Sequence, residues 1–102
     1  MSRVTLVRYT TKPGRADENE ALAAVAFAGL RASAPAGVTY AMFRDGSDFT
    51  HLFVNRAEAD SAVLTELPAF KAYAKDIGER CVAPPEVLRL DTDLREAYGL
   101  GG

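Results

Sequence analysis

The stretch from Gly37 to Asn55 constrains the fold most, because it reads as two strands joined by a tight turn. Two runs rich in β-branched and aromatic residues, GVTYAMFR and FTHLFVN, flank an Asp45-Gly46 pair. An Asp-Gly pair between such runs is the strongest short-range signal for a hairpin. The sequence therefore predicts a β-hairpin whose second strand carries the chain's single histidine, His51.

The segment before the hairpin predicts one strand and one helix. Strand-like alternation covers Arg3–Thr10, and Pro13 and Gly14 end it, because proline lacks a ladder N–H and glycine permits a positive φ. Asp17 is the expected N-cap of the helix, with Glu20 closing a capping box. The apolar face is expected to comprise Leu22, Val25, Ala26 and Gly29, with Ala23, Phe27 and Leu30 beside it, before Pro35-Ala36-Gly37 ends the helix.

The segment after the hairpin predicts a loop, a helix and a strand. Residues 56–66 are polar and alanine-rich, which favours a loop with at most one helical turn. Pro68 suits the first position of a helix, and an apolar stripe at spacings of three and four predicts that this helix continues to Cys81. The stripe consists of Leu67, Phe70, Ala74, Ile77 and Cys81. Glu86–Asp91 is the expected last strand, a short helix is expected over 93–98, and 99–102 are expected to fray.

The predicted order is therefore β-α-β-β-α-β, the split βαβ of ferredoxin-like α+β domains. We expect a four-stranded antiparallel sheet with both helices on one face. A chain of 102 residues with 48% apolar and 25% charged residues suits one globular domain, residues 1–102. Its core is expected over about residues 3–92, with a tail over 93–102.

Neither face of the predicted sheet is polar. Alternation places Val38, Tyr40, Met42, Phe49, His51 and Phe53 on one face of the hairpin, and Thr39, Ala41, Phe43, Thr50, Leu52 and Val54 on the other. A sheet with one solvated face should alternate between apolar and polar residues. We therefore expect the face without helices to meet a second copy of the chain, forming a homodimer.

Composition argues against several partners. A net charge of −2 and a pI near 5.3 do not favour nucleic acid, and the predicted third strand lacks the basic residues and glycines of an RNA-binding domain. One cysteine cannot form an internal disulfide, so a reducing, cytoplasmic location is expected. No signal-peptide or membrane-spanning run, metal-ligand cluster or phosphate loop is present, so no membrane, metal or cofactor partner is predicted.

The chain resembles the dimeric α/β-barrel superfamily, and within it the antibiotic-biosynthesis monooxygenase-type domains. The resemblance rests on the order of elements, on Lys12-Pro13-Gly14-Arg15 before an acidic helix start, and on Ala36-Gly37-Val38-Thr39-Tyr40 at the entry to the hairpin, and it spans roughly Val4 to Asp91. It implies homodimers of ferredoxin-like subunits, each with a pocket between sheet and helices.

Members of this family include cofactor-independent oxygenases acting on polycyclic phenols, haem-degrading enzymes, and proteins without an established activity. Many active relatives carry a tryptophan near the end of the third strand, where this chain has Asn55 and no tryptophan anywhere. Haem-degrading relatives place a histidine on the second helix, and the matching stretch Leu67–Lys71 has none. The resemblance therefore implies an oxygenase-like domain and not haem degradation.

His51 is the candidate catalytic residue, because a histidine among apolar neighbours can act as a general base or position a phenol. The alternative is a histidine hydrogen-bonded to Tyr40 or to the partner subunit, without chemistry. The candidate substrate-binding residues are Tyr9, Tyr40, Phe49, Phe53, Asn55 and Tyr73, of which Asn55 is placed by the resemblance alone; each also has an ordinary packing or capping role open to it.

Three arginines on or beside strands, Arg8, Arg44 and Arg89, could bind an anionic group, although an ion pair with Asp48 or Asp91 is the simpler role. Two functions remain open. One is a cofactor-free oxygenase for an aromatic or quinone-like molecule, in which His51 and tyrosines polarise the substrate. The other is a non-catalytic homodimeric binding or scaffold module.

Overall fold

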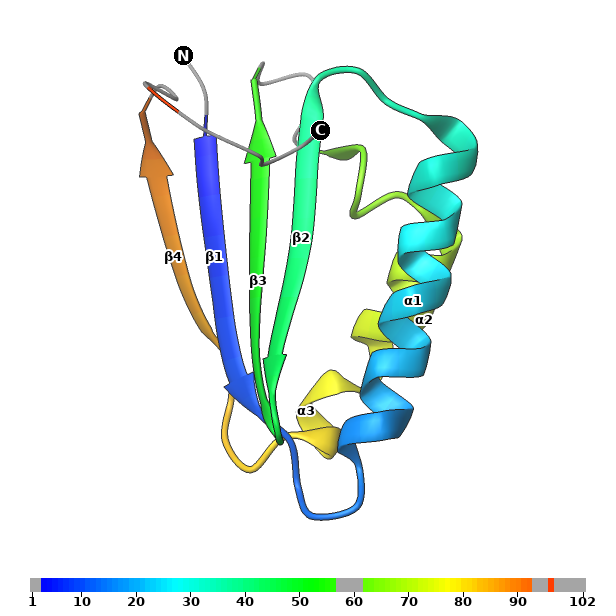
Figure 1. Ribbon diagram of the computed structural model, residues 1–102, viewed down its shortest axis with the longest axis vertical. Coiled ribbons are helices and arrows are strands. Elements are labelled where there is room, and N and C mark those ends of the chain that lie inside the picture. Colours follow the sequence, from blue (N-terminus) through cyan, green and yellow to red (C-terminus); the bar gives the residue numbers. More distant parts are fainter. Residues whose placement is uncertain (1–2, 57–61, 93–95, 97–102) are drawn as a thin grey trace.

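The computed structural model, which describes residues 3–56, 62–92 and 96, has one sheet with helices on one side (Figure 1). The elements in chain order are β1 (Arg3–Thr10), α1 (Ala16–Ser33), β2 (Val38–Asp45), β3 (Asp48–Asn55), α2 (Pro68–Lys75), α3 (Ile77–Arg80) and β4 (Glu86–Asp91). The strands lie in the order β2-β3-β1-β4, and each neighbouring pair is antiparallel. The predicted ferredoxin-like α+β fold is therefore confirmed.

The hairpin forms where the sequence predicts it, with β2 and β3 joined through Gly46 and Ser47. Asp45 pairs with Asp48, and Gly46 has a φ of +61°. Glycine at the first central position with a positive φ is the arrangement of a type II′ turn, whose twist matches that of the flanking strands. In this register Met42 lies directly opposite His51. Tyr40 lies diagonally across from His51, on the same side of the sheet.

Helix α1 begins earlier than predicted and buries a different face. Its N-cap is Arg15, which makes no side-chain capping bond, so the prediction of Asp17 as N-cap was wrong. Asp17 and Glu20 instead pair with Arg44 of β2, at 3.0 and 2.9 Å. The predicted apolar face was wrong at Val25, which is 59% exposed. The buried stripe comprises Ala16, Asn19, Ala23, Ala26 and Leu30.

The second helix is interrupted, whereas the apolar stripe predicted one helix to Cys81. Pro68 takes the predicted first position of α2, but Asp76 leaves the helical conformation with φ −116° and ψ 22°. The short helix α3 follows, and Cys81 pairs with Thr11 as an isolated bridge beside β1. Two backbone bonds fix this junction, from Lys12 N–H to the Arg80 carbonyl and from Val82 N–H to the Thr10 carbonyl.

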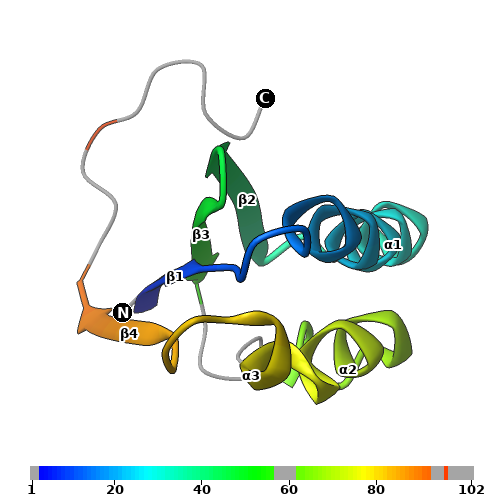
Figure 2. The same cartoon turned by 90° about the horizontal axis from the view of Figure 1, so that it is seen from below.

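The helices cover one face of the twisted sheet, as the view along the strands shows (Figure 2). Between the layers, one core cluster centres on Tyr9 and Phe49, and another comprises Leu30, Phe53 and Leu64. The outer face is largely apolar, and Phe43, Leu88 and Leu90 are 56%, 53% and 44% exposed there.

Several predictions concern residues at the margins of these elements. Within the predicted loop, residues 62–66 form turns, and Leu64 is buried. The helix expected over 93–98 and the frayed end over 99–102 lie outside the described residues. Among the helices of the described part, none is long and apolar enough to cross a membrane.

Candidate functional site

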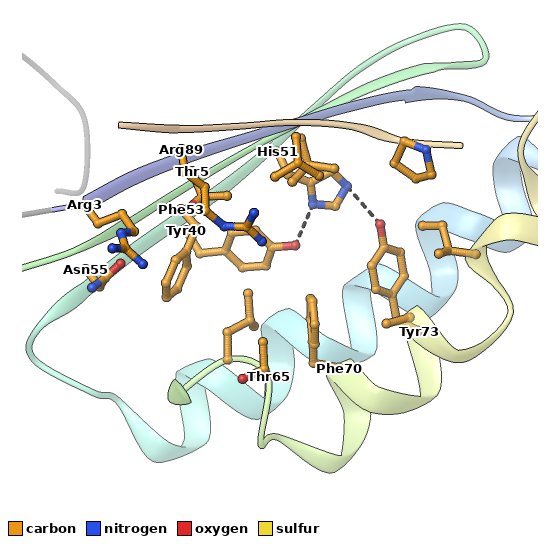
Figure 3. A pocket seen from close by; sticks show the side chains of 16 residues that line it. Arg3, Thr5, Tyr40, His51, Phe53, Asn55, Thr65, Phe70, Tyr73 and Arg89 are labelled. Atoms are coloured by element: carbon orange, nitrogen blue, oxygen red, sulfur yellow. Dashed lines mark hydrogen bonds between the residues drawn. The ribbon is translucent and has the colours of Figure 1, made fainter. Parts of the chain in front are cut away.

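A cavity of about 380 Å³ lies between the helix-facing side of the sheet and α2 (Figure 3). All four strands contribute to its wall, and α2, α3 and the turn before α2 complete it. Its lining residues are Arg3, Thr5, Val7, Tyr40, His51, Phe53, Asn55, Leu64, Thr65, Phe70, Tyr73, Ala74, Ile77, Pro85, Val87 and Arg89. A volume of this size is within the range of about 300–1,000 Å³ typical of small-molecule sites.

His51 is the centre of a buried hydrogen-bond cluster at one end of the cavity. Its Nδ1 lies 2.5 Å from the Tyr40 hydroxyl oxygen, and its Nε2 lies 2.8 Å from that of Tyr9 and 3.2 Å from that of Tyr73. The Tyr9 and Tyr73 hydroxyl oxygens are 2.5 Å apart. Both ring nitrogens of the imidazole therefore meet tyrosine hydroxyls, one at Nδ1 and two at Nε2.

The local structure explains why these four side chains converge. His51 and Phe53 point to the helix side because alternate residues of a strand share a face. Tyr40 reaches His51 from the neighbouring strand β2, and Tyr9 reaches it from β1 on the other side. Tyr73 approaches from α2, which packs against α1 on that side of the sheet.

Asn19 of α1 and Arg80 of α3 form a second tier behind the cluster, and the sequence analysis did not identify them. Asn19 is 0% exposed and Arg80 is 1% exposed. The Asn19 amide donates to the Tyr9 oxygen over 2.8 Å, and Arg80 Nε donates to the Asn19 carbonyl over 3.0 Å. Arg80 also donates to the backbone carbonyl of Tyr73 over 2.6 Å.

A sequence signal for this second tier exists in α1. Asn19 follows the same spacing as Ala16, Ala23, Ala26 and Leu30, so it is the polar member of an otherwise apolar stripe. A polar side chain in such a position requires a buried hydrogen-bond partner. Arg80 gives no comparable signal, because its burial depends on the break at Asp76.

Burial keeps the cluster uncharged at neutral pH. Desolvation lowers the pKa of His51 from 6.5 to about 4, because removal from water penalises the imidazolium. Desolvation likewise raises the pKa values of Tyr40, Tyr73 and Tyr9, which disfavours the tyrosinates. The cluster can therefore donate or accept hydrogen bonds at neutral pH, but it holds no ionised base.

The other end of the cavity is polar and basic. Arg3, Asn55 and Arg89 line it together, as Figure 3 shows. Arg3 pairs with Asp91 over 2.9 Å, whereas none of the described carboxylates lies within ion-pair distance of Arg89. Phe53 and Arg89 both pair with Thr5, between the level of Arg3 and that of His51, and Phe70 lies across the cavity from His51 (Figure 3). The cavity thus offers an apolar middle, a hydroxyl-rich wall and a guanidinium.

The predicted site residues fall into two groups. Tyr40, His51, Phe53, Asn55 and Tyr73 all line the cavity. Tyr9 and Phe49 do not line it; they are 6% and 1% exposed, and their rings stack at 5.3 Å in the core behind it. Tyr9 nevertheless reaches the site through its hydroxyl, whereas Phe49 contributes packing alone.

The three candidate arginines differ in position and in partners. Arg44 pairs with Asp17 and Glu20 rather than with Asp48 or Asp91, so the simpler role predicted for it had the wrong partners. Asp91 pairs with Arg3 instead. Arg8 points to the outer face beside a smaller hollow, and of the three only Arg89 reaches the cavity. In the described part of the chain, no three His, Cys, Asp or Glu side chains cluster as metal ligands would.

Comparison with known proteins identifies the fold. The sequence matches no protein-family model and no curated protein. Its structure is similar to that of an inferred antibiotic biosynthesis monooxygenase from Caulobacter crescentus, with a TM-score of 0.77 and 18% identity over 91% of each chain. An inferred antibiotic biosynthesis monooxygenase from Nitrosomonas europaea gives a TM-score of 0.74 and 12% identity, over 88% of this chain and 97% of that one.

A third similar structure is a mutant of SnoaB, described as a cofactor-independent oxygenase from Streptomyces nogalater. It gives a TM-score of 0.68 and 14% identity, over 92% of this chain and 95% of that one. The chain therefore has the fold of antibiotic biosynthesis monooxygenase-like structures, along nearly its whole length and with little sequence identity.

Proposed function

We propose that this protein is a small cofactor-independent, monooxygenase-like protein that binds an aromatic or quinone-type molecule in the cavity. The observation that carries the proposal is the placement of His51, Tyr40 and Tyr73 together on the wall of a cavity whose middle is apolar. Flat aromatic ligands suit an apolar pocket with a few convergent polar groups. The likeness to a structure described as a cofactor-independent oxygenase supports the same chemistry.

In the proposed reaction, the substrate supplies all the electrons. A phenolic substrate with an oxidisable CH₂ group would place its phenol oxygen against the Tyr40–His51–Tyr73 wall. Hydrogen bonds from the hydroxyls there would favour the electron-rich phenolate form of the substrate. One atom of O₂ would then enter the CH₂ group as a carbonyl oxygen, and the other would leave as water. The residues of the site bind, orient and shift protons, and the apolar middle of the cavity excludes water from the reacting carbon.

Oxygen uptake and ligand binding test this proposal. Dihydroxyanthrone, a tricyclic phenol with an oxidisable CH₂ group, should be consumed with O₂ faster than in a protein-free blank. The rate should fall in His51→Gln and stay unchanged in Val25→Ala, which alters an exposed position on α1. A bound ligand at about a hundred times its Kd should stabilise the fold by about 2.7 kcal/mol, a shift of roughly 11–22 °C in a domain of this size. Uptake equal to the blank would exclude the oxygenase.

A non-catalytic binding module is the second candidate, and the completeness of the cluster favours it. Each polar atom of His51 already has a partner within the protein, and none of the buried side-chain polar atoms in the described part is unsatisfied. Such a network can exist to stabilise a binding pocket. A thermal shift with dihydroxyanthrone that is not accompanied by oxygen uptake would select this function.

The assembly that we propose is a homodimer through the outer face of the sheet. That face exposes Phe43, Leu88 and Leu90, and the helices cover only the opposite one (Figures 1 and 2). Exposed apolar sheet surface of this kind is typical of a protein interface. An isologous pair of sheets would cover these side chains on both subunits at once.

A further inference from the structure

The direction of the hydrogen bonds in the His51 cluster is fixed from its buried end. A guanidinium can only donate, so Arg80 must meet the carbonyl oxygen of Asn19. The Asn19 amide nitrogen then faces Tyr9 and donates to its hydroxyl oxygen. The Tyr9 proton consequently points away from Asn19, toward His51 or Tyr73.

Consider first the cluster with the imidazole proton on Nδ1. Nδ1 then donates to the Tyr40 oxygen, and Nε2 accepts a proton from Tyr9 or Tyr73. The remaining hydroxyl of that pair donates to its neighbour, so both are satisfied. The Tyr40 proton has no acceptor in the cluster, and Tyr40 lines the cavity.

Consider next the cluster with the proton on Nε2. Tyr40 now donates to Nδ1, and Nε2 donates to one of the hydroxyl oxygens of Tyr9 and Tyr73. These two hydroxyls share only one contact, so only one of their protons can be used between them. Tyr9 is enclosed by Asn19, His51 and Tyr73, and Tyr73 lines the cavity, so the spare proton belongs to Tyr73.

We propose that His51 is a tautomeric switch that decides whether Tyr40 or Tyr73 presents a hydroxyl proton to the cavity. Either tautomer leaves one spare O–H, and a change of tautomer transfers it from one side of the imidazole to the other. The cluster stays neutral throughout, so no buried charge forms. This device matches a ligand that carries both a hydrogen-bond acceptor oxygen and an acidic hydrogen, one for each of the two hydroxyls, as an aromatic keto–enol compound does.

With such a ligand the switch would catalyse tautomerisation. Tyr40 gives its proton to the ligand oxygen, and Tyr40 is reprotonated from Nδ1. Nε2 takes a proton from Tyr73, directly or through Tyr9, and Tyr73 removes a proton from the ligand. One O–H bond forms on the ligand and one C–H or O–H bond breaks, without any change in oxidation state. The choice of ligand class rests on the proposed function, whereas the switch itself does not.

Nitrogen NMR of the protein alone tests the switch. The chain has a single histidine, so the imidazole signals of uniformly ¹⁵N-labelled protein need no assignment. Tyr73→Phe removes the hydroxyl whose proton is free in the Nε2-protonated form. This variant should therefore hold the imidazole proton of His51 on Nδ1. Tyr40→Phe removes the acceptor for Nδ1 and should hold the proton on Nε2, because an unpaired buried N–H is the costlier defect.

In the wild type, the two nitrogen shifts should lie between those of the two variants. The same tautomer in both variants, or a wild-type spectrum identical to that of either one, would overturn the switch. His51→Gln should abolish the imidazole signals while retaining a donor and an acceptor, and it serves as the matched inactive form in the ligand experiment.

Deuterium exchange into 2-tetralone, an aromatic ketone with acidic C–H bonds, tests the ligand class. Without oxygen in D₂O, the wild type should accelerate exchange at least tenfold over His51→Gln, and Tyr40→Phe and Tyr73→Phe should each lose most of it. Exchange equal to that of His51→Gln would overturn the ligand class. This experiment contains no oxygen, so its result does not depend on oxygenase activity. Exchange by a protein that shows no oxygen uptake with dihydroxyanthrone would support the switch and exclude only the oxygenase.

Discussion

The hydroxyl oxygens of Tyr9 and Tyr73 lie 2.5 Å apart, although 64 residues separate the two tyrosines in the chain. This contact joins the central strand β1 to α2 and closes the buried end of the cavity. His51 bonds to both hydroxyls, so the same three side chains hold the helix against the sheet and form the site. The stability of the fold therefore depends on side chains of the candidate site, which the first two predictions use.

The neutral state of His51 predicts that the fold loses stability in mild acid. Its pKa is lowered from 6.5 to about 4 in the folded state, so the unfolded chain binds the extra proton more readily. Stability from this group is complete above pH 6.5 and falls as the pH drops toward 4, by about 1.4 kcal/mol per pH unit. Arg80 is the charged side chain that packs against this cluster, with its guanidinium 5.4 Å from the centroid of the Tyr73 ring.

Urea unfolding at pH 7 and pH 5 measures this effect. The wild type should lose about 2 kcal/mol between the two values. His51→Gln cannot titrate and should lose clearly less over the same interval, which separates this group from the carboxylates. An equal loss in both proteins would mean that His51 is not held neutral.

The Arg80–Asn19 contact predicts a strong but shared contribution to stability. Arg80→Ala and Asn19→Ala should each cost about 2–4 kcal/mol, because each leaves a buried polar partner unsatisfied. The double variant should cost less than the sum of the two. Denaturant midpoints give all three values, with Arg31→Ala at an exposed position as the control. Strict additivity would contradict the coupling of these side chains.

The position of Arg89 in the cavity predicts that the protein binds acidic aromatic ligands more tightly than neutral ones. It lines the basic end of the cavity, where a carboxylate could accept two hydrogen bonds from its guanidinium. Calorimetric binding of 1-naphthoate should weaken by roughly 10- to 100-fold in Arg89→Gln, whereas that of neutral 1-naphthol should change little. Arg8→Gln, on the outer face, provides the matched control. A parallel loss of both ligands would indicate a change in cavity shape instead.

The outer sheet face predicts the assembly. In sedimentation velocity, the wild type should behave as a dimer, and a Phe43→Glu, Leu88→Glu double variant should behave as a monomer. Placing like charges on both copies of an isologous interface repels the subunits. Val25→Glu alters an equally exposed apolar residue on α1 and should leave the dimer intact. A wild type that sediments as a monomer would exclude this interface.

The sequence by itself determined the hairpin, the strands and which strand residues share a face. Alternation is a local property with a period of two, so one turn at Gly46 places Tyr40 and His51 on the same side without further information. The same alternation places Phe53 on the face of Tyr40 and His51. Tyr73 was a candidate only because a tyrosine offers a ring and a hydroxyl to a pocket, and its helix position gave no such signal.

Only the tertiary structure decided how deeply each residue lies and what it touches. The break at Asp76 depends on packing between α3 and the end of β1, and it is this break that brings Arg80 beneath Asn19. The rotation of α1 that buries Asn19 and exposes Val25 reflects the close approach that its alanines allow. Contacts between residues distant in the chain depend on the whole fold, because their geometry is set by elements that no local pattern relates to one another.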